Sequence, residues 1–165
     1  ETTFGVLTCR LLASQAPRNV ANFVGLARGL RPFRDPRSNT WITRPAYDGT
    51  IFHRVIPNFM IQGGDPSGTG SGEPGYVIPD EVWAGGAHDR PGLLCAANRG
   101  PDTNGMQFFI TDGAAAHIDN GFTIFGVCGP VETVHQIAMI PKDQRDRPQF
   151  PAVMNSVKIR RVPGP

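Results

Sequence analysis

The sequence is poor in cysteine and in charge, and each shortage excludes a class of protein. Its 165 residues include three cysteines, an odd number without a Cys-x-x-Cys motif, which argues against a disulfide framework. Each cysteine lies in an apolar, strand-like segment, so we expect Cys9, Cys95 and Cys128 to be small buried side chains. The net charge is +2 and the basic residues are dispersed outside residues 31–44 and 160–161. We therefore expect no binding of nucleic acid.

Long apolar runs and metal-binding spacings are also absent from the sequence. No apolar run approaches the roughly 20 residues that cross a bilayer, so we expect a soluble protein without a membrane span. The chain begins at Glu1, and any leader lies outside it, which leaves the cytoplasm and the periplasm both open. The four histidines lack His-x-x-x-His spacing. The glycine pattern at residues 70–77 lacks the flanking strand and helix of a nucleotide site, so we expect no metal and no cofactor.

The composition is typical of one folded domain, which we expect to span residues 1–165. Pro17 suits a first helical turn, and the spacing of Val20, Phe23 and Ala27 predicts an amphipathic helix that stops at Gly29. Residues 30–49 form a polar connection that Trp41 and Tyr47 are expected to hold against the body. A second helix is predicted at 131–139, a loop at 63–75, and strands at 3–12, 51–56, 59–62, 93–97, 106–111, 123–128 and 153–162. This pattern indicates an antiparallel β-barrel or β-sandwich capped by helices, and it does not distinguish the two.

Residues 51–65 carry the strongest functional signal. Alternation along this strand places Phe52, Arg54 and Ile56 on one face, with His53 and Val55 on the other. An arginine on an apolar face is costly to bury unless it has a partner or a function. Residues 95–110 add further amides and aromatic side chains. Together the two segments predict an apolar groove with a few fixed hydrogen-bond donors, which is typical of a binding site.

Both segments resemble the cyclophilin family of peptidyl-prolyl cis-trans isomerases. The resemblance covers nearly the whole chain and is most specific at residues 52–57 with 62–65 and at residues 98–110. Weaker similarities occur at residues 16–23, 90–92 and 125–126, and residues 33–49 resemble a bacterial branch. The resemblance implies a mainly β fold, namely a closed eight-stranded antiparallel β-barrel capped by two α-helices.

The resemblance also implies a role for each candidate site residue. Arg54 corresponds to the catalytic arginine of the family. His117 stands where many members have a tryptophan on the pocket rim, and Phe122 stands where many have a histidine at the pocket floor. Arg99 stands where many have a small residue. The proline pocket is then expected to be lined by Phe59, Met60, Phe109 and Ile118, with Gln62, Ala97, Asn98 and Gln107 bordering it and holding the peptide backbone.

The function implied is acceleration of X-Pro bond rotation in folding proteins. The expected partners are proline-containing peptides and unfolded proteins. Cyclosporin is a further expected ligand, whose binding His117 weakens, and we expect a monomer. Two alternatives stay open at this point: a proline-peptide binding module with little turnover, and a hydrolase. Client proteins and the residue preferred before proline are not determined by the sequence.

Overall fold

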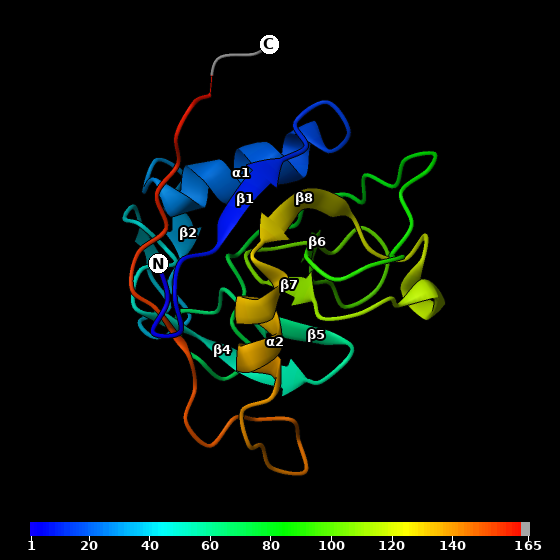
Figure 1. Cartoon of the computed structure of the whole chain (residues 1–165). Coiled ribbons are helices and arrows are strands. Elements are labelled where there is room, and N and C mark those ends of the chain that lie inside the picture. The colour runs from blue at the N-terminus through cyan, green and yellow to red at the C-terminus, as the bar shows by residue number, and fades with distance from the viewer. Residues whose placement is uncertain (163–165) are drawn as a thin grey trace.

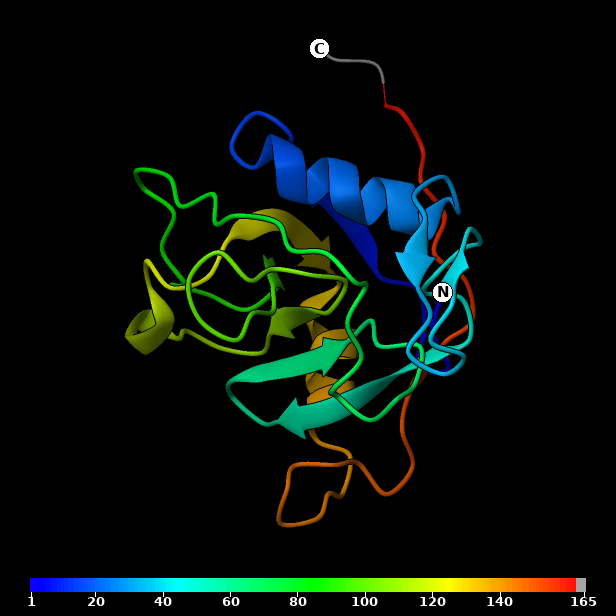
Figure 2. The same ribbon diagram turned by 180° about the vertical axis from the view of Figure 1, so that it is seen from behind.

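A seven-stranded antiparallel sheet dominates the computed structural model, which describes residues 1–162, so residues 163–165 of the expected domain lie outside it. The strand order is β1-β8-β6-β7-β5-β4-β9, and the sheet curls around the interior (Figures 1 and 2). A separate ladder pairs β2 (Phe33–Arg34) with β3 (Trp41–Ile42). The strands of the large sheet are β1 (Thr8–Leu11), β4 (Thr50–Ile56), β5 (Met60–Gly63), β6 (Leu93–Ala96), β7 (Phe108–Thr111), β8 (Ile124–Gly129) and β9 (Val153–Met154).

The curled sheet does not close, so the expected closed eight-stranded barrel is wrong. Within residues 1–162, the edge strands β1 and β9 form no ladder with each other, and Thr2 reaches Met154 only through an isolated bridge. The strand expected at 3–12 is shortened because the chain turns at Gly5, whose φ of 129° lies outside the range of other residues. The strand expected at 153–162 ends after two residues. The result is a half-barrel of mainly β structure.

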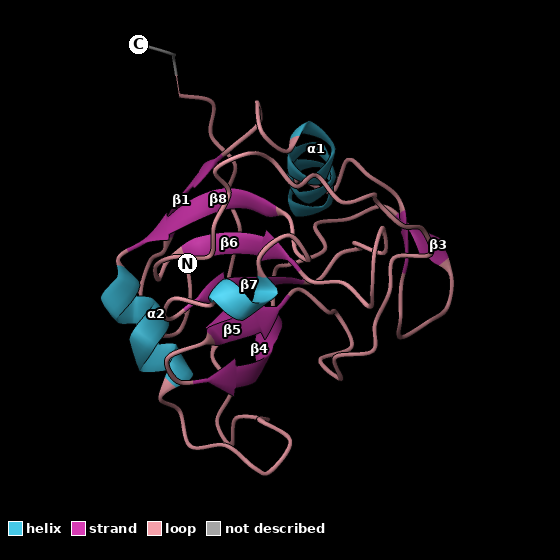
Figure 3. Ribbon diagram, turned by 90° about the vertical axis from the view of Figure 1, so that its right-hand side faces the viewer, coloured by secondary structure: helices cyan, strands magenta, loops and turns pink. Residues whose placement is uncertain are grey.

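Two helices cover the half-barrel at opposite ends, as Figure 3 shows. Helix α1 (Pro17–Ala27) begins at the predicted proline and is followed by Gly29 in the left-handed region at φ 65°. Helix α2 (Val131–Ala138) agrees with the second predicted helix. Apolar side chains of both helices, Phe23 and Ile137 among them, pack into one interior cluster with the inner face of the sheet. Burial of these faces holds the half-barrel together.

The connection of residues 30–49 is held by Tyr47 and not by Trp41. Tyr47 is buried, and its hydroxyl donates to the carbonyl of Met106 at 3.0 Å. Trp41 is 57% exposed, so the expectation for it is wrong. The reason is the register of the small ladder, which turns Phe33 inward and therefore leaves Trp41 on the outer face.

Cys9 and Cys128 form a disulfide, contrary to the expectation from the odd cysteine count. They are directly opposite each other on the neighbouring strands β1 and β8, with their Cα atoms 4.0 Å apart. A pairing across 119 residues follows from strand register, which cysteine spacing does not reveal. Cys95 is free and fully buried, as predicted for it.

Candidate functional site

A bulge in strand β4 decides which side chains accompany Arg54. The pairing of β4 with β5 shifts between Phe52 and Arg54. Phe52 and Val55 therefore both face the interior cluster, and the prediction that Phe52 shares a face with Arg54 is wrong. Ile56 does share that face, as predicted, and packs on the opposite side of the sheet from the interior cluster. The Arg54 side chain is 44% exposed and so lies at the surface.

Strand register then aligns Arg54 with the other candidate residues. Arg54 is opposite Gln62 on β5, and Gln62 is opposite Phe109 on β7. Phe109 is in turn opposite Cys95 on β6. Because directly paired residues point to the same face of a sheet, one row runs from a cation through an amide to an aromatic ring. Segments far apart in the sequence thus build one surface.

An apolar cluster, separate from the interior one, lies on this outer face of the sheet. Its buried centre contains Met60 and Phe109. Cys95 belongs to the same buried centre, and burial raises the pKa of its thiol well above the ordinary value. This cluster unites the predicted pocket residues and adds others that the sequence reasoning did not assign to the pocket, Ile56 and Trp83 among them. The partly buried side chains packed on it are Ile56, Phe59, Trp83, Ala97, Ile118, Phe122 and Val127.

Two aromatic contacts shape the surface of this cluster. The ring of Phe122 meets that of Phe109 edge to face, with centroids 5.5 Å apart. The ring of His117 lies 5.1 Å from that of Phe59. His117 is exposed on a short 3-10 helix, η1 (Ala116–Ile118). Exposed His117 therefore contacts the apolar cluster through Phe59, and Phe122 contacts it through the buried ring of Phe109.

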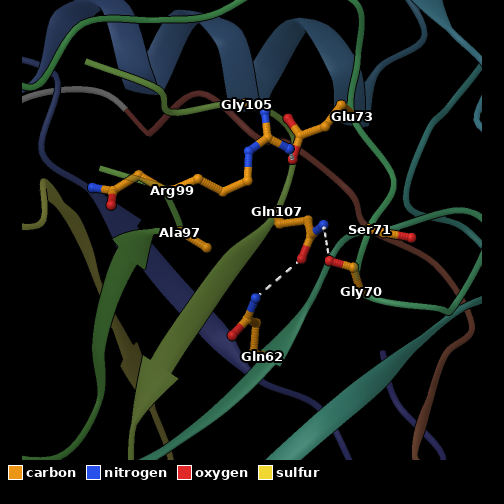
Figure 4. A pocket seen from close by; sticks show the side chains of 9 residues that line it. Gln62, Gly70, Ser71, Glu73, Ala97, Arg99, Gly105 and Gln107 are labelled. Carbon is orange, nitrogen blue, oxygen red and sulfur yellow. Dashed lines mark hydrogen bonds and ion pairs between the residues drawn. The ribbon is translucent and has the colours of Figure 1, made fainter. Parts of the chain in front are cut away.

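The side chains of Gln62 and Gln107 form a hydrogen-bonded chain of amides (Figure 4). Because Gln62 is paired with Phe109, this amide chain borders the apolar surface on one side. The Gln62 side chain donates to Gln107 Oε1 at 3.0 Å. Gln107 Nε2 in turn donates to the carbonyls of Gly70 and Gly72, each at 2.9 Å. These hydrogen bonds hold both glutamine side chains in one orientation. The Gln62 carbonyl oxygen takes no part in the chain of amides and is directed away from it.

The loop that receives Gln107 is organised by Asp65, which is fully buried. Its carboxylate accepts hydrogen bonds from the backbone N–H groups of Ser67, Gly70 and Gly72. The Ser67 hydroxyl also donates to it, at 2.7 Å. Burial raises the pKa of Asp65, but these donors outweigh it and hold the pKa below the ordinary value. The glycine-rich segment is thus an ordered loop, held by hydrogen bonds to Asp65, and it positions the side-chain amide of Gln107.

A cavity of about 220 Å³ opens beside the amide chain. Arg99 reaches across it and forms an ion pair with Glu73 (Figure 4). Burial raises the pKa of Glu73, and the positive charge of Arg99 opposes this rise. The cavity is lined by Gln62, Gly70, Ser71, Glu73, Ala97, Asn98, Arg99, Gly105 and Gln107.

Asn98 ties the two sides of the site together. Its side chain donates to the carbonyl of Gly121 at 2.9 Å and accepts from the N–H of Gly100 at 3.2 Å. The segment after β6 is therefore fixed to the loop that carries Phe122. The hydrogen bonds of the Asn98 side chain thus connect two loops of the site.

Neither a metal cluster nor a membrane helix is found among residues 1–162. No group of three or more His, Cys, Asp or Glu side chains there is arranged to hold a metal ion. In the same part of the chain, every helix is too short or too polar to cross a bilayer.

Comparisons with known proteins agree on one family. The family model described as cyclophilin type peptidyl-prolyl cis-trans isomerase/CLD matches residues 1–159. Peptidyl-prolyl cis-trans isomerase A of Mycobacterium tuberculosis is 45% identical over 162 residues, covering 96% of this chain and 89% of that protein. Peptidyl-prolyl cis-trans isomerase B of Streptomyces anulatus is 45% identical over 163 residues, covering 96% and 93%.

Solved structures give the same result. A cyclophilin type peptidyl-prolyl cis-trans isomerase of Cryptosporidium parvum matches with a TM-score of 0.83 and 33% identity, covering 98% of this chain and 95% of that one. A second crystal structure of that protein, in the presence of the dipeptide Ala-Pro, matches with a TM-score of 0.82. With its fold, its outer apolar surface and these relatives in agreement, the chain belongs to the cyclophilin family and is a peptidyl-prolyl cis-trans isomerase.

Proposed function

We propose that Arg54 is the catalytic residue of this isomerase and that the outer apolar surface seats the substrate proline. The observation that carries the proposal is the row formed by Arg54, Gln62 and Phe109 across three neighbouring strands. It sets a permanent positive charge beside an aromatic floor. The partly exposed guanidinium is open to a substrate on this face.

The chemistry of amide rotation explains why an arginine suits this place. Resonance stiffens the X-Pro bond, so rotation unaided takes roughly tens to hundreds of seconds. In the twisted transition state the proline nitrogen becomes pyramidal and regains a lone pair. The guanidinium of Arg54 donates a hydrogen bond to that lone pair, which the planar ground state lacks. An interaction present mainly in the transition state raises the rate of the chemical step.

The required energy is compatible with one cation and a pocket. Raising a rate from about 0.01 to about 1,000 per second lowers the barrier by roughly 7 kcal/mol. A hydrogen bond from a charged donor contributes about 1.5–3 kcal/mol. The remainder comes from gripping the proline ring while its neighbour turns. The residues proposed to grip it are Phe59, Met60, Phe109, Ile118 and Phe122.

The amide side of the site holds the peptide backbone in this proposal. Gln62 is oriented by Gln107, so that its carbonyl oxygen is available to a peptide N–H. Within residues 1–162, the backbone N–H and C=O of Asn98 have no hydrogen-bond partner in the chain, and they lie beside the cavity next to Ala97. An extended peptide pairs with such groups as a strand pairs with a sheet edge.

The substrates are X-Pro segments of unfolded proteins, in keeping with the Cryptosporidium parvum relative, whose structure was also determined in the presence of Ala-Pro. Cyclosporin binds more weakly than it does to relatives with a rim tryptophan, because His117 offers less apolar area. The protein acts as a monomer, with residues 1–165 forming one domain.

Substitution of Arg54 by alanine tests the catalytic role. In an NMR exchange assay on an Ala-Pro peptide, we expect Arg54→Ala to lose about two decades of kcat/KM, as on removal of a key electrostatic donor. Peptide binding by the variant, measured by chemical-shift titration, is expected to persist because the apolar surface is intact. Arg90→Ala, which removes an exposed arginine paired with Asp89, is the matched control and keeps full activity. Equal rates for Arg54→Ala and the native chain would exclude the role.

A further inference from the structure

The guanidinium of Arg54 has an acidic partner that the catalytic scheme does not include. Arg54 Nη2 lies 3.5 Å from Asp146 Oδ2. Among residues 1–162, this is the one ion pair of the Arg54 side chain. A half-exposed arginine has many rotamers. The contact with Asp146 therefore selects among them.

Asp146 is presented by a loop with its own internal order. The loop spans residues 141–148, between α2 and β9. The carboxylate of Asp143 accepts the backbone N–H groups of Arg145 and Arg147 at 2.8 and 3.0 Å. An isolated bridge joins Lys142 to Pro148 and closes the base of the loop. Asp146 is thus supported by a folded turn.

The backbone of this loop is joined to the strand that carries Arg54. The N–H of Val55 donates to the carbonyl of Asp146 at 2.9 Å. Asp146 itself has φ 63°, in the left-handed region that aspartate and asparagine tolerate better than most residues. Two neighbouring positions on β4 thus contact Asp146, one through the backbone and one through the side chain.

A second cation shares the Asp146 carboxylate. Lys142 Nζ contacts Oδ1, while Arg54 contacts Oδ2. The three groups together carry a net charge of +1, so the carboxylate does not cancel the charge of Arg54. It engages one terminal nitrogen of the guanidinium, so the other N–H groups remain free to donate.

We propose that Asp146 is a positioning residue for catalysis, which holds the Arg54 guanidinium where the turning amide nitrogen meets it. The proposal rests on the proposed catalytic role of Arg54. Fixing the cation before the substrate arrives avoids ordering it during the reaction, which is how preorganised donors lower a barrier. Loss of the Asp146 carboxylate is therefore expected to slow the turnover step more than it weakens peptide binding.

Asp146→Asn is the sharpest test because it removes the charge and keeps the shape. Asparagine also tolerates positive φ, and the backbone bond to Val55 is retained. We expect kcat to fall about fivefold to tenfold with KM nearly unchanged. In an Arg54→Ala background, the same substitution is expected to change nothing further, because Asp146 acts through Arg54. Asp89→Asn, which also removes a carboxylate paired with an arginine, is the matched control and keeps native rates.

The outcomes separate this inference from the proposed function. Native kcat in Asp146→Asn, together with a slow Arg54→Ala, would overturn the positioning role alone. A native rate in Arg54→Ala would remove the catalytic role as well. A further loss on adding Asp146→Asn to Arg54→Ala would show that Asp146 acts by another route, and would also overturn the inference.

A measurement on the unsubstituted protein guards against a variant that folds poorly. The Nε–Hε group of Arg54 is observable by ¹⁵N relaxation, and Arg160, which has no side-chain partner among residues 1–162, is the internal reference. We expect Arg54 to be markedly more ordered than Arg160. Equal mobility of the two side chains would contradict the proposal.

Discussion

Replacing Asp65 by asparagine would test whether one buried carboxylate organises the amide side of the groove. The carboxylate accepts five hydrogen bonds within the glycine-rich loop. Oδ1 receives the N–H and the hydroxyl of Ser67, while Oδ2 receives the Thr69 hydroxyl and the N–H groups of Gly70 and Gly72. An asparagine side chain keeps one of these two oxygens and brings an N–H₂ group to the place of the other. At least two hydrogen bonds are therefore lost.

The size of the effect follows from burial and charge. Hydrogen bonds to a charged group contribute about 1.5–3 kcal/mol each, and Asp65 is 0% exposed, so water does not replace them. Such losses are not additive within one network. We therefore expect Asp65→Asn to lower the free energy of unfolding by about 3 kcal/mol.

The pH dependence of this difference has a definite sign. Burial raises the pKa of Asp65, but the hydroxyl of Ser67 and the N–H groups of Gly72, Ser67 and Gly70 bring it below the ordinary value. The native state thus favours the ionised form. The stability from Asp65 is full above the unfolded pKa of about 3.9 and is lost as the pH falls through the lower native value. The gap between native chain and variant should close over that acidic range.

The same substitution should reach the active site through Gln107. The carbonyls of Gly70 and Gly72 hold its amide, and that amide orients Gln62. A loosened loop is expected to reduce kcat/KM about tenfold, since small misplacements of positioning groups are costly. Urea unfolding and the NMR exchange assay measure the two effects.

Ser67→Ala is the control for Asp65→Asn. It removes one hydroxyl donor and leaves the carboxylate in place, so we expect a loss of only about 1 kcal/mol. An Asp65→Asn protein with the native urea midpoint and native kcat/KM would refute the account of this loop.

Two further predictions concern the disulfide and the cavity. The Cys9–Cys128 disulfide closes a loop of sequence separation 119, so Cys9→Ser should lower the free energy of unfolding by about 2–4 kcal/mol in urea. A reducing agent should lower the free energy of unfolding of the native chain to the value of the variant. An unchanged free energy of unfolding after reduction would contradict a stabilising role of the disulfide. Arg99→Ala should open the cavity that the ion pair with Glu73 crosses, raising kcat/KM about tenfold for peptides with bulky side chains next to proline. If Arg99→Ala and the native chain rank a series of peptides in the same order of kcat/KM, Arg99 has no role in substrate selection.

Local patterns predicted the elements of this fold well. The helix at Pro17 is confirmed because a proline start, an apolar stripe and a closing Gly29 act within one segment. Most strand positions are confirmed for the same reason. The surface position of Arg54 is also consistent with its sequence, since burying a charged side chain costs free energy.

Patterns of this kind did not determine how the elements combine. The sheet stays open because a turn at Gly5 and a short β9 limit edge pairing, which depends on two distant ends of the chain. The bulge at Phe52 reverses the face of that side chain, because one extra residue in a strand shifts the alternation.

The sequence by itself determined the kind of chemistry: an arginine, amides and aromatic rings, in an order that resembles one family. The tertiary structure alone decided which of them meet. It paired Cys9 with Cys128, brought Asp146 to Arg54 and set Arg99 across a cavity toward Glu73. These contacts join residues 119, 92 and 26 positions apart. Strand register and the packing of loops bring such residues together. The local sequence pattern around each residue specifies neither of the two.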